Sequence, residues 1–394
     1  KLYVHDEPFW LPHANVRSFD RRLNMKSGTL DRDVVWETPA GKKVSIRSRR
    51  LVSFEHRHLA AMLYEVTLLN AAAPVVLSSE MIANEPTPRR DNRDPRQAKV
   101  FTEKVLNHRL SYARDQRIVL CHATAKSGMI LSCSIDHVLE TSSPTTWKTH
   151  QTQDAGQVVA TINAEPGQPI TLVKYMAYHV SHTAPPEEMC ARVERTLDRA
   201  VDDGFPALLT GQERYVGDFW ERSDVRVTTN PSKAKATTTA VQQAIRFNLF
   251  HVLQAAARAE NTGVPAKGLT GGAYEGHYFW DTEIYVLPFL TYTVPRIAKN
   301  LLRFRHGMLD KARERARQLN QRGAMYPWRT INGEEASAYY AAGTAQYHIN
   351  ADIMYALRKY VQVTGDEEFL FEEGAEMLVE TARLWLSLGF YSPR

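Results

Sequence analysis

The stretch ITLVKYMAYHVSHTAPPEEMCARVERTL, residues 170–197, contains the change of pattern that decides the fold. Up to Val180 it is a short run rich in apolar and β-branched residues, which is typical of a strand. After Pro185 the apolar residues recur with the spacing of an amphipathic helix. The sequence therefore predicts β-structure on the N-terminal side of this stretch and helices on its C-terminal side.

On the N-terminal side, residues 1–184 contain many short segments of this strand type, separated by turn signals such as Pro166-Gly167. Many short strands at such spacing predict a large antiparallel β-sandwich. The polar stretch 85–99 is expected to be a loop. The predicted strands are KLYVHDE (1–7), TLDRDVVWET (29–38), KKVSIRSRRLVSF (42–54), AAMLYEVTLLN (60–70), PVVLSSEM (74–81), RIVLCHATA (117–125), GMILSCSID (128–136), QVVATINAE (157–165) and ITLVKYMAYHV (170–180).

On the C-terminal side, residues 185–235 are expected to form linker helices, and residues 236–394 a helical domain. Apolar periodicity predicts helices at about 237–260, 279–291, 295–320, 347–364 and 367–388. Helix pairs of this kind bury their apolar faces in bundles or α/α barrels. The fold class is therefore a multidomain combination of β and α.

The bulk composition excludes several classes of protein. A length of 394 residues favours two domains, and a net charge of +5 spread along the chain is too small for a nucleic-acid footprint. The basic stretch 303–322 is interpreted as a solvated helix face. Three scattered cysteines indicate neither a disulfide framework nor a zinc site, and the apolar runs are too short to cross a bilayer. No signal peptide is recognised, so we expect a cytoplasmic location.

The block HYFWDTE, residues 277–283, places Tyr278, Phe279 and Trp280 directly before Asp281 and Glu283. Flat aromatic side chains meet the apolar faces of pyranose rings, and carboxylates bind their hydroxyl groups. The alternative is an ordinary helix start, in which the acidic residues favour the helix dipole and Trp280 packs in the core. The block alone leaves both interpretations open.

Two further clusters combine aromatic and charged residues. GAMYPWRTINGEE, residues 323–335, is a loop because Pro327 breaks helices, and it carries Trp328, Arg329, Glu334 and Glu335; a surface loop with buried anchors is the slightly favoured alternative. QYHINAD, residues 346–352, has His348 and Asp352 one helical turn apart, and a capped helix start is its commoner meaning.

Together, AKGLTGGAYEGHYFWDTEIYVLPFL (266–290), GAMYPWRTINGEE, HINADI (348–353) and VTGDEEFL (363–370) resemble the α-glucosyl disaccharide phosphorylases. That family includes maltose, trehalose and kojibiose phosphorylases and is grouped with acid trehalases among the glycoside hydrolases. The likeness covers essentially the whole chain and is most specific over 238–391. It implies an N-terminal β-sandwich, linker helices, the N-terminal part of an (α/α)6 catalytic barrel, and a homodimer.

The resemblance also assigns roles to residues. It implies that Trp280 and Asp281 line the subsite for the cleaved glucosyl unit, and that the loop 326–335 contacts the acceptor-side sugar; Glu283 keeps its structural interpretation. The predicted substrate-binding residues are Tyr278, Phe279, Trp280, Asp281, Trp328, Arg329, Glu334, Glu335 and His348.

The family's general acid, a glutamate in a GP-(D/N)-E-Y segment, does not occur in these 394 residues. The resemblance places it beyond Arg394, so we assign no catalytic residue here and expect this stretch alone to be inactive. The implied reaction is inverting phosphorolysis, with inorganic phosphate as co-substrate and no cofactor or metal, because phosphate replaces the base-activated water of a hydrolase. The alternatives are a trehalose-type hydrolase and a non-catalytic carbohydrate-binding fragment.

Overall fold

The computed structural model describes residues 1–85, 104–228, 235–256, 260, 262–269, 274–337, 346–390 and 392. The loop expected at 85–99 lies, apart from Glu85, outside the described residues. The chain divides into two compact units, one made of residues 1–89 with 100–218 and the other of 90–99 with 219–394.

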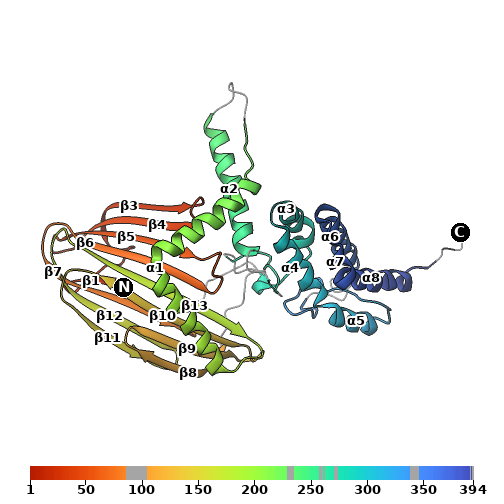
Figure 1. Ribbon diagram of the computed structural model, residues 1–394, viewed down its shortest axis with the longest axis horizontal. Helices are drawn as coiled ribbons and strands as arrows, with labels where there is room; N and C mark the ends of the chain where they lie inside the picture. The colour runs from red at the N-terminus through yellow and green to blue at the C-terminus, as the bar shows by residue number, and fades with distance from the viewer. Residues whose placement is uncertain are drawn as a thin grey trace. The chain divides into compact units, whose positions relative to one another are not determined.

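The first unit is an antiparallel β-sandwich, as the sequence predicts (Figure 1). One sheet has the strand order β11-β12-β7-β1-β2, and the other has the order β3-β4-β5-β6-β13-β10-β9-β8. The strands are β1 (Leu2–Val4), β2 (Glu7–Pro8), β3 (Asn15–Asn24), β4 (Thr29–Glu37), β5 (Lys43–Val52), β6 (Leu59–Leu68), β7 (Ala73–Ile82), β8 (Leu106–Arg114), β9 (Arg117–Thr124), β10 (Ile130–Glu140), β11 (Thr145–Gln151), β12 (Ala155–Ala164) and β13 (Pro169–Ser181).

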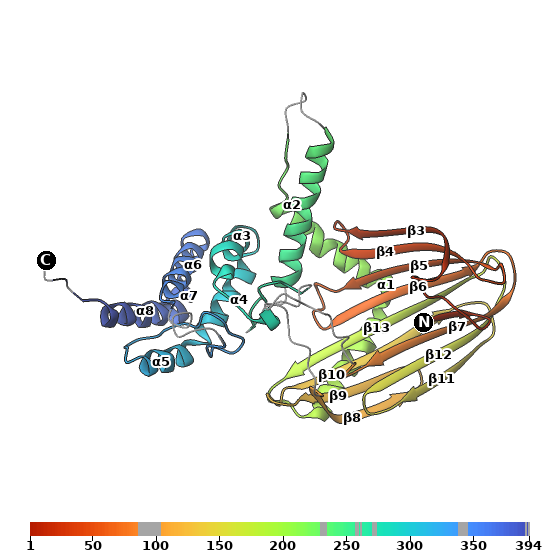
Figure 2. The same cartoon turned by 180° about the vertical axis from the view of Figure 1, so that it is seen from behind.

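Strand β13 explains why residues 170–180 are almost continuously apolar. Ile170 and Leu172 point into the core between the two sheets, whereas Val173 and Tyr175 point to the opposite face and join a second core. That second core is closed by the first part of helix α1 (Pro186–Ser223), which crosses in front of the strands in Figure 1 and behind them in Figure 2. A strand that is buried on both faces loses the alternation of a half-exposed one.

Four strands, β2, β3, β8 and β11, are not among the segments that the sequence predicts, apart from Glu7 at the start of β2. All four lie at the edge of a sheet. Their side chains are exposed or half-buried, with no fully buried residue in any of the four. Edge strands that carry polar and charged residues avoid pairing with other chains, and the same composition removes the apolar signal by which a strand is recognised.

The second unit is helical over its described part. Three expected helices are each split: 295–320 divides into α4 and α5 at Gly307, 279–291 contains a π-helical turn at Thr282–Val286 before α3, and 367–388 contains a second π-helical turn between α7 and α8. The expected linker helices are present as α1, whose range contains two helices that meet at a kink at Gly204, where φ is 75° and ψ is 163°. The remaining elements are α2 (Lys235–Ala256), α3 (Leu287–Thr293), α4 (Pro295–His306), α5 (Leu309–Gln318), α6 (His348–Thr364), α7 (Glu367–Phe369), a π-helical turn at Leu370–Gly374, and α8 (Ala375–Leu388).

Candidate functional site

The aromatic–carboxylate block and the loop 326–335 lie side by side. Tyr278 and Thr330 form an antiparallel β-bridge, in which the Tyr278 N–H donates to the Thr330 carbonyl at 2.7 Å and the Thr330 N–H donates back at 3.2 Å. The two clusters are separated by some fifty positions in the chain, and this bridge places them next to each other. Two regions that the sequence singled out independently are therefore neighbours in the fold.

Ring contacts bring the third cluster to the same place. Phe279 packs edge-to-face on Trp328 with ring centroids 5.2 Å apart, and Trp280 packs edge-to-face on His348 at 4.9 Å. Such edge-to-face pairs are a preferred aromatic geometry. The aromatic block, the loop and the start of α6 thus converge on Phe279 and Trp280.

Within the block, Trp280 and Asp281 reach the surface, as does His277 at its start. Trp280 is half-buried and packs against the hydrophobic core of this unit, and Asp281 is exposed. Asp281 precedes the π-helical turn but its side chain does not cap it. The packing of Trp280 agrees with the helix-start interpretation, and Asp281 lies at the N-terminus of the turn, where its charge favours the helix dipole, so both interpretations of the block remain open. The Asp281 carboxylate remains in a position to accept hydrogen bonds from a polar ligand beside the indole.

Glu283, two positions further on, has the opposite environment. Its carboxylate is fully buried and binds the Arg305 guanidinium at 2.8 Å and 3.2 Å, and it accepts a hydrogen bond from the Tyr278 hydroxyl at 2.6 Å. The structural interpretation of Glu283 is thereby supported. The interpretation of 303–322 as a solvated face is wrong for Arg305, which is 0% exposed. Arg305 follows Leu301 by four positions and so continues the apolar stripe of α4, a signal that the sequence did offer.

The charged residues of the loop hold the loop itself. The Glu335 carboxylate accepts hydrogen bonds from the backbone N–H groups of Trp328 at 2.7 Å and Arg329 at 3.3 Å. The Arg329 guanidinium pairs with Glu275 at 3.0 Å, and Glu334 pairs with Lys311 at 2.7 Å. These contacts give Glu335 a defined role in shaping the loop, beside any contact with a ligand.

His348 is the first residue of α6, and its side chain is exposed. Its Nδ1 lies 2.8 Å from the Asp352 carboxylate, and its Nε2 lies 2.9 Å from the Gln346 side-chain oxygen. The residue at the cap position of α6, Tyr347, makes no side-chain capping hydrogen bond. The His348–Asp352 pair therefore orients the imidazole against Trp280, and the capped helix start that was the commoner interpretation is not observed.

Asn350 is a residue of the site region that sequence reasoning did not select. It is fully buried, its side-chain oxygen accepts from the Tyr326 N–H at 3.1 Å, and its amide donates to the Ala324 carbonyl at 2.8 Å. The sequence did contain a signal for Asn350, because it is a polar residue on the apolar side of α6, between Ile349 and Ile353. A buried side-chain amide normally has hydrogen-bond partners, so its position indicated a structural contact.

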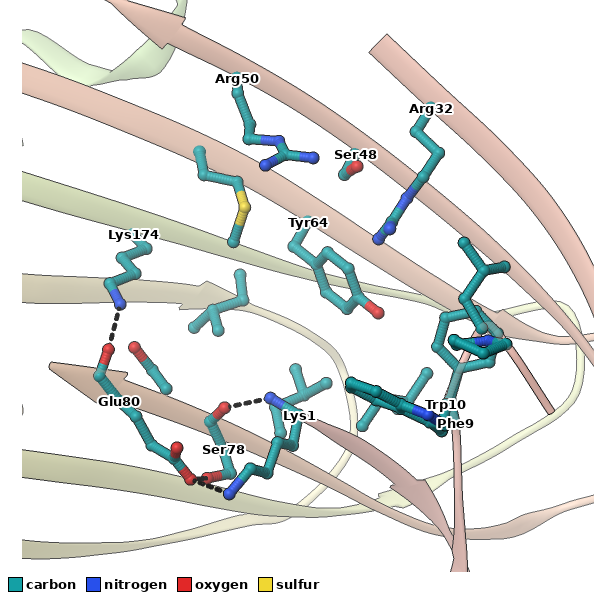
Figure 3. Close-up of a pocket in the computed structure, with 17 residues that line it drawn as sticks. Lys1, Phe9, Trp10, Arg32, Ser48, Arg50, Tyr64, Ser78, Glu80 and Lys174 are labelled. Carbon is teal, nitrogen blue, oxygen red and sulfur yellow. Dashed lines mark hydrogen bonds and ion pairs between the residues drawn. The ribbon is translucent and has the colours of Figure 1, made fainter. Parts of the chain in front are cut away.

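A cavity of about 620 Å³ lies in the β-sandwich (Figure 3). Arg32, Arg50 and Lys174 line it, and burial lowers the pKa of Lys174 to about 8, although Glu80 opposes that shift. A smaller cavity of about 260 Å³ adjoins the loop and is lined by Pro327 and Glu335 among others. None of the sequence-predicted site residues lines the larger cavity.

Over the described parts of the chain, no group of three or more His, Cys, Asp or Glu side chains is arranged to hold a metal ion. A search of the same residues finds no helix that is both long and apolar enough to cross a membrane.

Comparison with known proteins bears on the whole chain. Alpha,alpha-trehalose phosphorylase from Thermoanaerobacter brockii is 40% identical over 393 residues, which cover 100% of this chain and 50% of that protein. Kojibiose phosphorylase from Escherichia coli (strain K12) is 31% identical over 405 residues, covering 98% of this chain and 50% of that protein. The chain spans about half the length of these curated relatives.

A solved structure provisionally named a kojibiose phosphorylase, from the human microbiome, shares the fold with a TM-score of 0.86. The two sequences are 24% identical, and the match covers 100% of this chain and 49% of the solved chain. The N-terminal domain of glycosyl hydrolase family 65 matches residues 1–219, and the central catalytic domain of the same family matches residues 246–394. The resemblance found in the sequence is confirmed: the chain belongs to glycosyl hydrolase family 65, a family of enzymes.

Proposed function

We propose that this protein catalyses the inverting phosphorolysis of an α-linked glucosyl disaccharide to glucose 1-phosphate and a free sugar. The observation that carries the proposal is the pairing of an exposed carboxylate, Asp281, with a half-buried indole, Trp280, on a segment bonded to the loop 326–335. Relatives that are named trehalose and kojibiose phosphorylases support this reading. Trehalose is the first substrate to test, because the more similar of these relatives carries that name.

In the proposed reaction, the indole face contacts the C–H face of the glucosyl ring and Asp281 accepts hydrogen bonds from its hydroxyl groups. A general acid protonates the leaving oxygen while phosphate attacks from the opposite face, which inverts the anomeric configuration. We assign the proton donor to none of the described carboxylates. Glu283 is committed to Arg305, and Asp281 is placed to bind hydroxyl groups.

The proposal extends to the wider architecture. We propose that α2 to α8 contribute to an (α/α)6 barrel, that the protein is a cytoplasmic homodimer, and that phosphate and the disaccharide are its partners. The remaining predicted site residues are proposed to shape the two sugar subsites: Tyr278 and Phe279, which are buried, by supporting the block from within, and Trp328, Arg329, Glu334, Glu335 and His348 by contact with the sugars.

The test uses the complete gene product, with trehalose, maltose, kojibiose and nigerose, in the presence and absence of inorganic phosphate. We expect glucose 1-phosphate to form from one of them only when phosphate is present. Equal turnover without phosphate would instead identify a trehalose-type hydrolase, and sugar binding without turnover would identify a carbohydrate-binding protein. Either result would refute phosphorolysis.

A matched pair of variants tests the role of Asp281. Asp281→Asn is expected to lower kcat/KM about tenfold to hundredfold, because a hydrogen bond to a charged group contributes about 1.5 to 3 kcal/mol. Asp310→Asn, which changes an aspartate that is 96% exposed, is the control and is expected to leave kcat/KM unchanged. An Asp281→Asn enzyme with the wild-type kcat/KM would remove Asp281 from the site.

A further inference from the structure

An ion pair that is shielded completely from solvent lies directly beneath the proposed sugar-binding residues. Glu283 and Arg305 are both 0% exposed, and the guanidinium binds both carboxylate oxygens, with Nε 2.8 Å from Oε1 and Nη2 3.2 Å from Oε2. This two-pronged geometry fixes the relative orientation of the two side chains as well as their distance. It joins the π-helical turn at Thr282–Val286 to the end of α4.

Tyr278 completes the arrangement. Its hydroxyl donates to Glu283 Oε1 at 2.6 Å, and its ring lies 4.6 Å from the Arg305 guanidinium carbon. The backbone of Tyr278 also forms the β-bridge with Thr330. The Tyr278–Glu283–Arg305 triad therefore connects three segments: the residues before the π-helical turn, the turn itself and α4, with the loop 326–335 attached through the bridge.

The protonation states of Arg305 and Tyr278 follow from their surroundings. Burial pulls the pKa of Arg305 down, but the Glu283 carboxylate more than offsets this and raises it overall. Burial also raises the pKa of the Tyr278 hydroxyl well above its ordinary value, and the neighbouring Glu283 carboxylate adds to that rise. Tyr278 thus remains a protonated donor and Arg305 a cation throughout the pH range in which proteins fold.

Stability alone does not explain such a triad. Replacing a buried ion pair by apolar side chains of similar volume is often neutral or stabilising, and in some proteins buried polar or ionic groups serve to define one geometry. In this protein, the orientation of Glu283 sets the orientation of Asp281. Side chains two positions apart in a helical turn point to nearly opposite sides, so that a Glu283 held inward directs Asp281 outward. The side chains are arranged in this way, with Glu283 buried and Asp281 exposed.

We infer that Tyr278, Glu283 and Arg305 are positioning residues that hold Trp280 and Asp281 in place, and in register with the loop 326–335, for recognition of the glucosyl unit. The inference rests on the proposed function, because it assigns a purpose to the triad only if Trp280 and Asp281 bind the sugar. The π-helical turn fits this role, since such turns occur frequently at functional sites. None of the three residues needs to touch the substrate.

The experiment uses the complete gene product and three conservative variants, Tyr278→Phe, Glu283→Gln and Arg305→Lys. Arg303→Lys is the matched control, because Arg303 lies on the same helix and pairs with Glu373 at 2.7 Å but is 41% exposed. Thermal unfolding first identifies a temperature at which every protein is folded. At that temperature, kcat and KM are measured with the active disaccharide, and affinity is measured by quenching of tryptophan fluorescence.

Tyr278→Phe removes one hydrogen bond and is expected to lower kcat/KM about threefold to tenfold. Glu283→Gln and Arg305→Lys disturb the geometry more and are expected to lower it by about a hundredfold, which is the order of effect for misplacing a binding group by about 1 Å. Arg303→Lys is expected to match the wild type. If the two larger changes prevent folding, Tyr278→Phe decides the matter.

A double-mutant cycle separates positioning from a merely structural role. If Tyr278 acts through Asp281, the effect of Tyr278→Phe disappears in the Asp281→Asn background, because the group that it positions is already lost. The same loss in both backgrounds would overturn the inference, as would a folded Tyr278→Phe protein with wild-type kcat/KM and affinity. The failure of the proposed function looks different: the wild type itself would then form no glucose 1-phosphate and bind no disaccharide.

Discussion

Asn350 is the residue whose replacement tests the architecture of the site most directly. Its side chain ties the segment before Trp328 to α6, through the Tyr326 N–H at 3.1 Å and the Ala324 carbonyl at 2.8 Å, with a further contact to the Thr381 hydroxyl at 3.3 Å. The side chain is fully buried, so water cannot replace it as a partner. Asn350→Ala therefore leaves a buried donor and a buried acceptor without the partner that they have in the native protein.

The expected magnitude follows from these two groups. Each buried polar group that loses its partner costs about 1 to 3 kcal/mol, so Asn350→Ala is expected to destabilise this region by about 2 to 6 kcal/mol. Asn350→Asp keeps the acceptor for the Tyr326 N–H but turns a carboxylate oxygen towards the Ala324 carbonyl. We expect it to be at least as destabilising above the pKa of the new carboxylate, because an unpaired buried charge adds to the cost.

The assay is amide hydrogen exchange, followed by mass spectrometry, on peptides that cover residues 323–330. A loss of about 2 kcal/mol corresponds to roughly thirtyfold faster exchange at the Tyr326 amide, because each 1.4 kcal/mol is a factor of ten. Gln362→Ala, an exposed change on the same helix, is the control and is expected to leave exchange unaltered. Wild-type exchange at Tyr326 in Asn350→Ala would refute the view that this side chain anchors the loop.

Two further predictions concern backbone conformation and pH. A left-handed backbone conformation costs a non-glycine residue roughly 1 to 2 kcal/mol even in open space. Gly323 has φ +76°, and a Cβ there would also lie 2.1 Å from the Glu380 carbonyl oxygen. Gly323→Ala is therefore expected to lower the free energy of unfolding by more than that, by about 3 kcal/mol or above. Gly365→Ala, with φ +68° and open space, should cost only that smaller amount, and equal shifts in urea denaturation would contradict the argument. Burial lowers the pKa of His137 to about 4, against the opposing effect of the Gln116 carbonyl. Because the unfolded chain then binds more protons than the folded one, the β-sandwich should gain stability on the order of 3 kcal/mol as pH rises from about 4 to about 6.5. His137→Gln should flatten that rise, and an unchanged slope in urea titrations at these pH values would count against His137 as its origin.

The sequence predicted well the elements whose signal is local. Nine segments of the sandwich carried β-branched or aromatic runs, and strands were found at all nine. Strand β3 has no such apolar run and contains Arg17, Asp20, Arg21 and Arg22 instead. It is an edge strand with both faces largely exposed, so its charged side chains are solvated. The helical stretch 295–320 was predicted as one piece because α4 and α5 have the same period, and the break at Gly307 does not interrupt the apolar pattern.

The residues of the site show the same division. The sequence singled out Trp280, Trp328 and His348 because each stands in an unusual local combination of aromatic and charged residues. It did not show that they meet, since the β-bridge and the ring contacts join segments far apart in the chain. It assigned Arg305 to a solvated face because a cation is usually solvated, and only the partner Glu283 overturns that default.

What the sequence determined by itself is the order of the two architectures, the change at Pro185 and the family, because periodicity and motifs are written in neighbouring residues. What the tertiary structure decided is which side of each segment faces inward. Asp281 and Glu283 are both acidic and two positions apart, yet one reaches solvent and the other is buried against Arg305. That difference arises from long-range packing. Burying a carboxylate is unfavourable unless an opposite charge pairs with it, and Arg305 of α4 provides that charge only for Glu283.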